Sequence, residues 1–195
     1  MSEDDWRELL ATADESLETL SVLVRDLLDV SRLQSGVLGV SVMPVDPAEV
    51  IMPALDELSL GPADVEIDLG SDVPEMVADP ALLQRVVVNL LSNALRYEPA
   101  GSRVRLAESS FANQVEIRVI DHGPGIPEDR RGDVMVPFQR LGDTDSSVGL
   151  GLGLALSKGF VEGMDGTLAL EDTPGGGLTM VISLPRVGVE EASVQ

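Results

Sequence analysis

At 195 residues with 44% hydrophobic content, the chain can bury a substantial core, and its size suits one domain plus an extra element. The absence of cysteine excludes disulfides and thiolate metal sites and fits a reducing compartment. A formal net charge of -21 without any Lys/Arg cluster argues against nucleic acid as a partner and against direct membrane contact, because both attract basic surfaces.

Residues 2–35 are predicted to form one long helix. Apolar residues recur in this segment at alternating spacings of four and three, which is typical of a helix-packing seam. Further leucines widen the stripe beyond a two-helix seam and favour a bundle. Packing against the helix's own domain and packing in an intermolecular bundle both remain open. The seam consists of Trp6, Leu10, Ala13, Leu17, Leu20, Val24 and Leu27, widened by Leu9, Leu23 and Leu28.

The acidic start, MSEDDWRELL, has the wrong charge for a signal or transit peptide. No uninterrupted apolar run reaches the roughly 18 residues that a membrane-spanning helix needs. The sequence therefore predicts a cytoplasmic location.

Helix caps and alternating strands predict the remaining elements. Pro47 and Pro80 each follow an aspartate, so they open helices that are predicted to end near residues 58 and 97. A further helix is predicted from about 150 to 162. Strands are predicted at 37–46, 65–69, 103–108, 114–121, 167–171 and 178–184.

The order of these elements predicts the fold class. Helices and strands are interleaved, but short turns join several strands, as in antiparallel pairs. We expect an α+β two-layer α/β sandwich, a mixed sheet with helices on one face, plus the long N-terminal helix. Residues 121–150 show little regular pattern and are predicted to act as a lid, and residues 186–195 are predicted to be a flexible tail.

Asn89 and Asn93 lie four residues apart on the helix predicted for 80–97, so they point the same way. An amide oxygen can ligate a hard cation such as Mg²⁺, and the NH₂ group can donate to a phosphate. The alternative is a pair of solvated surface residues.

Gly149, Gly151 and Gly153 stand where the helix near 150 is predicted to begin. Glycines there permit close backbone approach, and a helix N-terminus offers free amides to a phosphate. The stretch is neither a dinucleotide-binding fingerprint nor a Walker A loop. A hinge or tight helix packing is the alternative.

Asp121 ends an apolar strand, where a carboxylate tends to be partly buried and to need a donor such as the exocyclic amine of a purine. Gly123 and Gly125 let the chain turn under a flat ligand. The alternative is a structural turn with Asp121 as a local cap. His122, the single histidine, lies between these residues, where its ring would stack or hydrogen-bond only at the mouth of a pocket.

Five stretches in order resemble the motifs of sensor histidine kinases over residues 38–185: NLLSNALRY the N-box, DHGPGIP the first G-box, VPFQRLGD the F-box, GLGLGLALSKGFVEGMDGTL the second G-box, and GGGLTMVISLP the final strand. The family shares the Bergerat (GHKL) ATP-binding fold with gyrase, mismatch-repair and chaperone ATPases. LLDVSRLQSG and PFQRLGDTD are similar in particular to the Kdp-type potassium-responsive sensor kinases of actinobacteria.

The resemblance implies roles for individual residues, with ATP and Mg²⁺ as ligands. Asn89 and Asn93 would hold Mg²⁺ and the triphosphate, and Asp121 would accept from the adenine amino group, with Thr179 nearby through water. The resemblance also implies that Arg96 contacts phosphate in place of the usual lysine, and that Tyr97 contacts adenine or ribose. Phe138 would anchor the lid, Arg140 would reach the phosphates, Gly123 and Gly125 would line the adenine, and Gly149, Gly151 and Gly153 would cradle phosphates.

Asn89 also separates two branches of the superfamily. The resemblance implies that the ATPases carry a glutamate at this position as the base toward water. An amide cannot take a proton near neutrality, so the γ-phosphate is kept for another acceptor. Transfer would then rest on positioning and on charge neutralisation.

The resemblance implies a protein-histidine kinase whose acceptor histidine lies outside this chain. Residues 1–36 resemble the second helix of the dimerisation and phosphoacceptor bundle, 37–185 the ATP-binding catalytic domain, and 186–195 a tail. The chain alone is not expected to autophosphorylate. Its expected partners are the acceptor-histidine helix and a downstream response regulator, and the fragment would be the cytosolic part of a membrane-anchored kinase. Two other hypotheses remain: a GHKL-type ATPase, and a non-catalytic nucleotide-binding regulator of the anti-sigma type.

Overall fold

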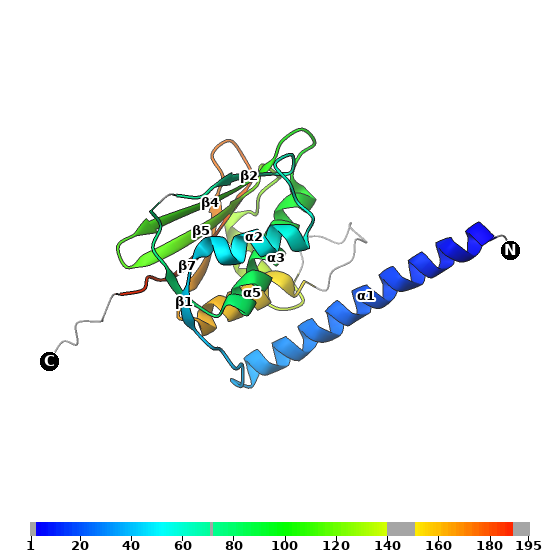
Figure 1. Cartoon of the computed structure of the whole chain (residues 1–195), viewed down its shortest axis with the longest axis horizontal. Coiled ribbons are helices and arrows are strands. Elements are labelled where there is room, and N and C mark those ends of the chain that lie inside the picture. The colour runs from blue at the N-terminus through cyan, green and yellow to red at the C-terminus, as the bar shows by residue number, and fades with distance from the viewer. Residues whose placement is uncertain (1–2, 71, 140–150, 189–195) are drawn as a thin grey trace.

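A computed structural model describes residues 3–70, 72–139 and 151–188 of the chain. Figure 1 shows a sheet with helices packed against it and one long helix that extends away from them. The elements in chain order are α1 (Glu3–Gln34), β1 (Met43–Val45), α2 (Pro47–Glu57), β2 (Val65–Asp68), β3 (Met76–Ala78), α3 (Pro80–Tyr97), β4 (Val104–Phe111), β5 (Gln114–Ile120), the 3₁₀ turn η1 (Glu128–Arg130), α4 (Arg131–Val134), α5 (Gly153–Gly163), β6 (Thr167–Asp172) and β7 (Leu178–Pro185).

The main sheet has five strands in the order β2-β4-β5-β7-β6. β2 runs parallel to β4, and the other neighbours are antiparallel. Leu106 lies opposite Val119, and Val119 lies opposite Met180, so one buried apolar row crosses the three central strands. The predicted mixed sheet in a two-layer α/β arrangement is confirmed.

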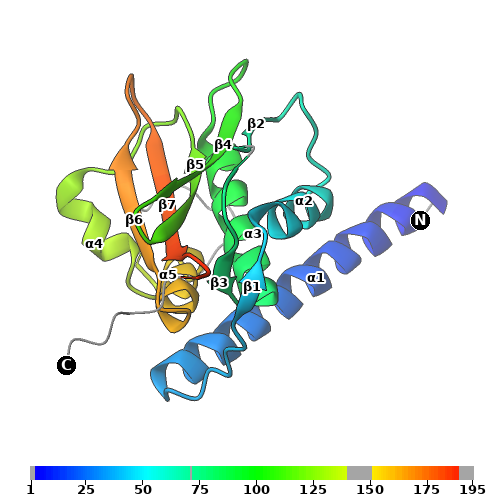
Figure 2. The same ribbon diagram turned by 60° about the vertical axis from the view of Figure 1, so that its left-hand side comes forward.

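Helices α2, α3 and α5 form the second layer on one face of this sheet (Figure 2). Both predicted aspartate caps are present: the Asp46 carboxylate accepts from the Ala48 N–H, and Asp79 accepts from the N–H groups of Ala81 and Leu82. The sheet-facing side chains of α3 are fully buried and form the centre of the core: Leu83, Val86, Val87, Leu90, Leu91 and Ala94.

The predicted strand over 37–46 is wrong except for β1. Its partner is β3, a three-residue strand that the sequence analysis missed, and Met43 pairs with Ala78 at its end. The next residue, Asp79, already caps α3, and its second carboxylate oxygen accepts from Ser41 N–H at 2.9 Å. The ladder therefore stops because its partner strand becomes a helix cap.

Two other stretches differ from the prediction. Residues 128–134, within the segment predicted to be irregular, form η1 and α4. The chain also stays hydrogen-bonded past the predicted end of the domain at residue 185, because Arg186 bridges to Met76 and the Val187 N–H donates to the Glu75 carbonyl at 2.9 Å. Residues 189–195 of the predicted tail lie outside the described residues.

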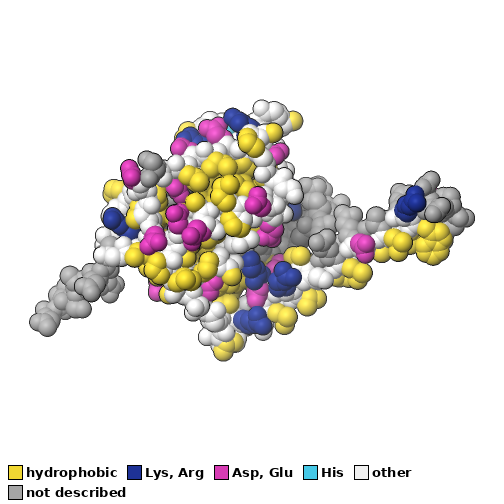
Figure 3. Space-filling view, viewed as in Figure 1, with side chains coloured by type: hydrophobic (Ala, Val, Ile, Leu, Met, Phe, Trp, Pro, Cys, Tyr) yellow, Lys and Arg dark blue, Asp and Glu magenta, His cyan; other side chains and the backbone are white. Residues whose placement is uncertain are grey.

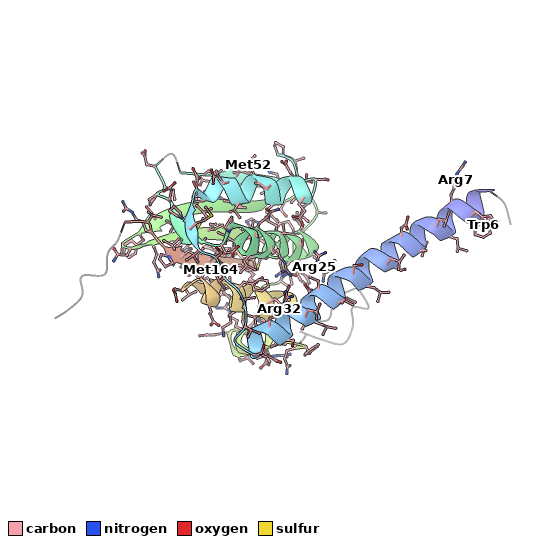
Figure 4. The ribbon with its side chains drawn as sticks, turned by 60° about the horizontal axis from the view of Figure 1, so that its bottom comes forward. Trp6, Arg7, Arg25, Arg32, Met52 and Met164 are labelled. Atoms are coloured by element: carbon pink, nitrogen blue, oxygen red, sulfur yellow. The ribbon has the colours of Figure 1, made fainter. Side chains whose placement is uncertain are left out.

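α1 packs against the rest of the protein through its last turns, where Asp29 and Val30 are buried. Leu33 lies so close to α5 that a Cβ atom on Gly159 would come within 2.6 Å of the leucine. Figure 4 shows Trp6 and Arg7 at the opposite end of α1, far from the sheet. None of the helices in the described parts of the chain is both long and apolar enough to cross a membrane.

The apolar stripe of α1 before these turns is open to solvent. Figure 3 shows apolar side chains following one edge of the helix. The seam residues there are 43% to 61% exposed, so the helix's own domain does not bury them within the described residues: Trp6, Leu10, Leu17, Leu20, Val24 and Leu27.

Candidate nucleotide-binding site

Asp121 directly follows β5 and is 3% exposed. Its Oδ1 accepts from the Gly123 N–H at 2.9 Å and from the Leu178 N–H at 3.0 Å. Within the described residues, its Oδ2 receives no hydrogen bond. Burial raises the pKa of Asp121, an effect that the two backbone hydrogen bonds oppose and the negative charge of Glu98 reinforces. The local cap that the sequence left as an alternative is therefore formed, and one oxygen is left to accept from a ligand.

The glycines after Asp121 lie where the turn meets other backbone segments. A Cβ atom on Gly123 would lie 2.6 Å from the Tyr97 carbonyl oxygen, so only glycine fits against the end of α3. Gly125 adopts a positive φ of 69° and packs against Gly177, in the turn before β7. The turn is thus held between α3 and β7.

Thr179 pairs with Ile120 on the neighbouring strand, one residue before Asp121. Its hydroxyl lies 2.9 Å from the hydroxyl of Thr173, and both side chains are buried. No hydrogen bond links Thr179 to Asp121 in the described structure. The Thr173–Thr179 pair joins the two ends of the glycine-rich turn, and the sequence analysis did not identify Thr173.

Asn89 lies at the point where α3 meets the start of α5. A Cβ atom on Gly153 would overlap the Asn89 amide oxygen, and the Asn89 NH₂ group donates to the Ser157 hydroxyl at 2.8 Å. Because this donor is used, Oδ1 is the Asn89 atom that remains for a cation. Asn93 is half-buried one turn further along α3. The structure therefore brings Asn89 and Gly153, two of the residues predicted to bind nucleotide, into contact.

Arg96 and Tyr97 end α3 and are exposed. The Tyr97 side chain is 51% exposed, while its backbone contacts Gly123. These two residues thus lie next to the turn that carries Asp121, and Asn93 lies about one helical turn before them on α3.

Phe138 lies within the predicted lid, and Gly151 directly follows the end of that segment. The Phe138 N–H donates to the Gly151 carbonyl at 3.1 Å, and Phe138 takes a positive φ of 68°. The Phe138 ring is 57% exposed, so among the described residues its attachment is through the backbone. Arg140 and Gly149 lie outside the described residues.

The sequence analysis missed two polar partners at this site. Ser157 is buried beside Asn89, and its spacing of four from Gly153 along the same helix face was the available signal. Glu98 receives the backbone N–H of His122 at 2.9 Å. The signal here was an acidic residue at a helix C-terminus, where the helix dipole disfavours negative charge.

The donor set bears on which cation the site suits. Within the described parts of the chain, no group of three or more His, Cys, Asp or Glu side chains converges. A cation at Asn89 would therefore be held by amide oxygen together with oxygens of the ligand itself. This fits Mg²⁺, which usually takes few protein ligands and shares substrate phosphates.

Comparisons with known proteins show which family and which individual proteins this chain resembles. Residues 78–188 match the family described as histidine kinase-, DNA gyrase B- and HSP90-like ATPase. Sensor protein KdpD of Rathayibacter rathayi is 66% identical over 166 residues, covering 85% of this chain and 19% of that protein. Sensor protein KdpD of Mycobacterium tuberculosis H37Rv is 43% identical over 191 residues, covering 94% and 22%. The chain spans about a fifth of the length of these curated relatives.

Two solved structures have a fold similar to that of this chain. The mycobacterial sensor histidine kinase MprB is 32% identical, with a TM-score of 0.64 over 75% of this chain and 98% of that one. Full-length ShkA in complex with AMPPNP is 26% identical, with a TM-score of 0.77 over 92% of this chain and 38% of that one.

Proposed function

Because the chain belongs to the histidine kinase-, DNA gyrase B- and HSP90-like ATPase family, we propose that residues 37–185 bind ATP·Mg²⁺ and transfer its γ-phosphate to a histidine outside this chain. One observation carries the proposal. A buried carboxylate with a free oxygen, Asp121, lies at the turn that packs on the end of α3, while Asn89 of the same helix contacts the first glycine of α5. In this proposal, helix α3 therefore connects the site for the adenine base with the site for the phosphates.

In this proposal Asp121 accepts a hydrogen bond from the adenine amino group, and Gly123 and Gly125 lie under the base. The backbone at Gly151 and Gly153 faces the phosphates at the start of α5, where the N-cap residue Leu152 makes no side-chain hydrogen bond to the first N–H groups. Tyr97 contacts the base or ribose. Thr179, engaged with Thr173, supports the turn and contacts adenine only through water.

Asn89 and Asn93 would hold Mg²⁺, and Arg96 would contact phosphate. The chemistry that Mg²⁺ supplies when bound is neutralisation of phosphate charge. Asn89 is an amide whose NH₂ is bonded to Ser157, so it cannot serve as a base that removes a proton from water. The residues therefore favour transfer to a protein acceptor over ATP hydrolysis.

The single histidine, His122, follows the residue proposed to bind adenine, and for this reason it is not proposed as the acceptor. We propose that α1 is the second helix of a dimerisation bundle, since its exposed stripe needs an apolar partner. The acceptor-histidine helix and a response regulator would be the partners. The similarity to KdpD proteins supports a potassium-responsive kinase whose cytosolic part includes this chain.

Titration with ATP and Mg²⁺ tests the site directly. Asp121→Ala should weaken ATP binding by at least about tenfold, because it removes a charged hydrogen-bond acceptor. Asn89→Ala should abolish transfer to an added acceptor-helix fragment, assayed with labelled ATP. Asn113→Ala, at an exposed asparagine between β4 and β5, is the matched control and should bind and transfer normally.

Unchanged ATP affinity in both site variants would contradict the proposed placement. Steady phosphate release by the wild-type chain, without any labelled acceptor, would favour the ATPase alternative. Binding of a partner regardless of transfer would favour the non-catalytic regulator.

A further inference from the structure

Glu98 is the C-cap residue of α3, and its side chain is 6% exposed. Both features are unfavourable for a carboxylate. The C-terminal end of a helix carries partial negative charge, and burial without partners penalises an ion. A carboxylate at this position therefore needs strong local donors.

His122 supplies these donors from the turn that carries Asp121. Its backbone N–H donates to Glu98 Oε2 at 2.9 Å, and its ring Nδ1 lies 3.1 Å from Oε1. Both carboxylate oxygens are thus bonded to one residue. Burial alone would raise the pKa of Glu98, but hydrogen bonds from Ser102 and from the backbone and ring of His122 outweigh it and hold the pKa below its ordinary value. Glu98 is ionised at neutral pH.

This contact fixes the turn on the side that faces α3. On the other side, Asp121 is tied to β7, because its N–H donates to the Leu178 carbonyl and its Oδ1 accepts from the Leu178 N–H. On the α3 side, Gly123 lies against the Tyr97 carbonyl, and Glu98 holds the residue between Asp121 and Gly123. The residue after Asp121 can thus shift only if the Glu98 contact breaks.

We propose that Glu98, through His122, is a positioning residue that orients Asp121 for adenine and ties the base site to the helix carrying Asn89. The inference rests on the proposed function, because it assumes that Asp121 recognises the base. Glu98 touches no substrate in this scheme. Its removal should therefore impair discrimination between bases more than it impairs binding of the triphosphate.

The test is the affinity of the chain for MgATP and for MgGTP, measured by calorimetry in variants of Glu98. Glu98→Ala should weaken MgATP binding about tenfold while MgGTP binding changes little, so that the preference for ATP narrows by about the same factor. Glu98→Gln keeps an oxygen for the His122 N–H but loses the charge, and the preference should fall only about threefold. Glu75→Ala, at an exposed glutamate whose backbone carbonyl accepts from the Val187 N–H, is the matched control and should leave both affinities unchanged.

If Glu98 acts only on stability, Glu98→Ala would weaken the binding of MgATP and MgGTP equally. That result, or an unchanged preference for ATP, would overturn the inference. Should Glu98→Ala fail to fold, the smaller loss of preference in Glu98→Gln decides, and no loss overturns it. Asp121→Ala separates this inference from the proposed function. If Asp121→Ala abolishes the preference and Glu98→Ala retains it, only the positioning role fails; if Asp121→Ala retains the preference, the base site itself is misplaced.

Discussion

Helices α1 and α3 are both long and amphipathic, but their apolar faces have different environments. The face of α3 lies against the sheet, where Leu90 is fully buried. The face of α1 is open to solvent over most of its length, and Leu20 is 56% exposed. An apolar stripe therefore shows that a helix needs a partner, while the rest of the fold decides whether the same domain supplies it.

Within the described residues, Arg85 connects the two helices through polar contacts. Arg85 of α3 donates to Asp29 at 2.6 Å, lies 3.6 Å from Asp26, and places its guanidinium group 5.0 Å from the centre of the Phe160 ring. Asp29 is 3% exposed, so the last turns of α1 have a fixed position on the domain, although the preceding turns project from it. Variants at Leu90, Leu20, Asp29 and Asp26 test this difference between the two helices.

The largest difference in stability is expected between Leu→Ala variants of the two helices. Leu90→Ala on α3 should lower the free energy of unfolding by about 2–5 kcal/mol, because it leaves a cavity in the core. Leu20→Ala on α1 should change it by less than about 0.5 kcal/mol in the monomer, because the side chain is already exposed. Urea denaturation at low protein concentration measures both, and equal losses would mean that α1 is buried in solution.

A smaller effect is expected where the helices meet. Asp29→Ala removes the acceptor of Arg85 and should weaken docking of α1 by about 1–3 kcal/mol, since hydrogen bonds to charged groups contribute this much. Amide hydrogen exchange should quicken in the last turns of α1 and in α5. Asp14→Ala, at an exposed aspartate earlier in α1, is the control, and equal exchange in both variants would show that the Asp29 contact does not hold the helix.

The smallest effect is expected on how stability changes with pH, through Asp26. Burial, joined by the charge of Asp29, raises the pKa of Asp26 despite the opposing charges of Arg85 and Arg25. A raised folded-state pKa contributes stability that is present below the ordinary carboxyl pKa and lost as the pH rises through the raised value. Asp26→Asn stays neutral, so its stability relative to wild type should increase from about pH 3 to pH 7. A difference that stays flat over this range, measured by urea denaturation, would mean that Asp26 does not titrate differently in the folded protein.

The sequence predicted elements best where local chemistry defined both ends. α3 was predicted at 80–97 and observed there, because Asp79 and Pro80 fix its start and Pro99 follows its end. β3 was missed because three residues are too few for alternation to be visible. β1 was predicted too long because only β3 and the Asp79 cap determine where its pairing stops.

The same limit applies to the site. Asn89, Gly153 and Asp121 were proposed as site residues from residue type and motif spacing. The Glu98–His122 contact joins residues that are 24 apart in the sequence, and no periodicity connects them. The sequence predicted His122 only as a residue at the mouth of a pocket, and the structure shows that its backbone N–H as well as its ring contacts Glu98.

The contact between Leu33 and Gly159 links two positions that are far apart in the chain. A Cβ atom on Gly159 would come within 2.6 Å of the end of the Leu33 side chain, so a side chain at this position requires Leu33 to turn aside. A larger residue at 159 fits only if the Leu33 side chain turns aside, residue 33 becomes smaller or α1 moves away. The sizes of the side chains at positions 33 and 159 should therefore vary together among related proteins in which the last turns of α1 pack against α5.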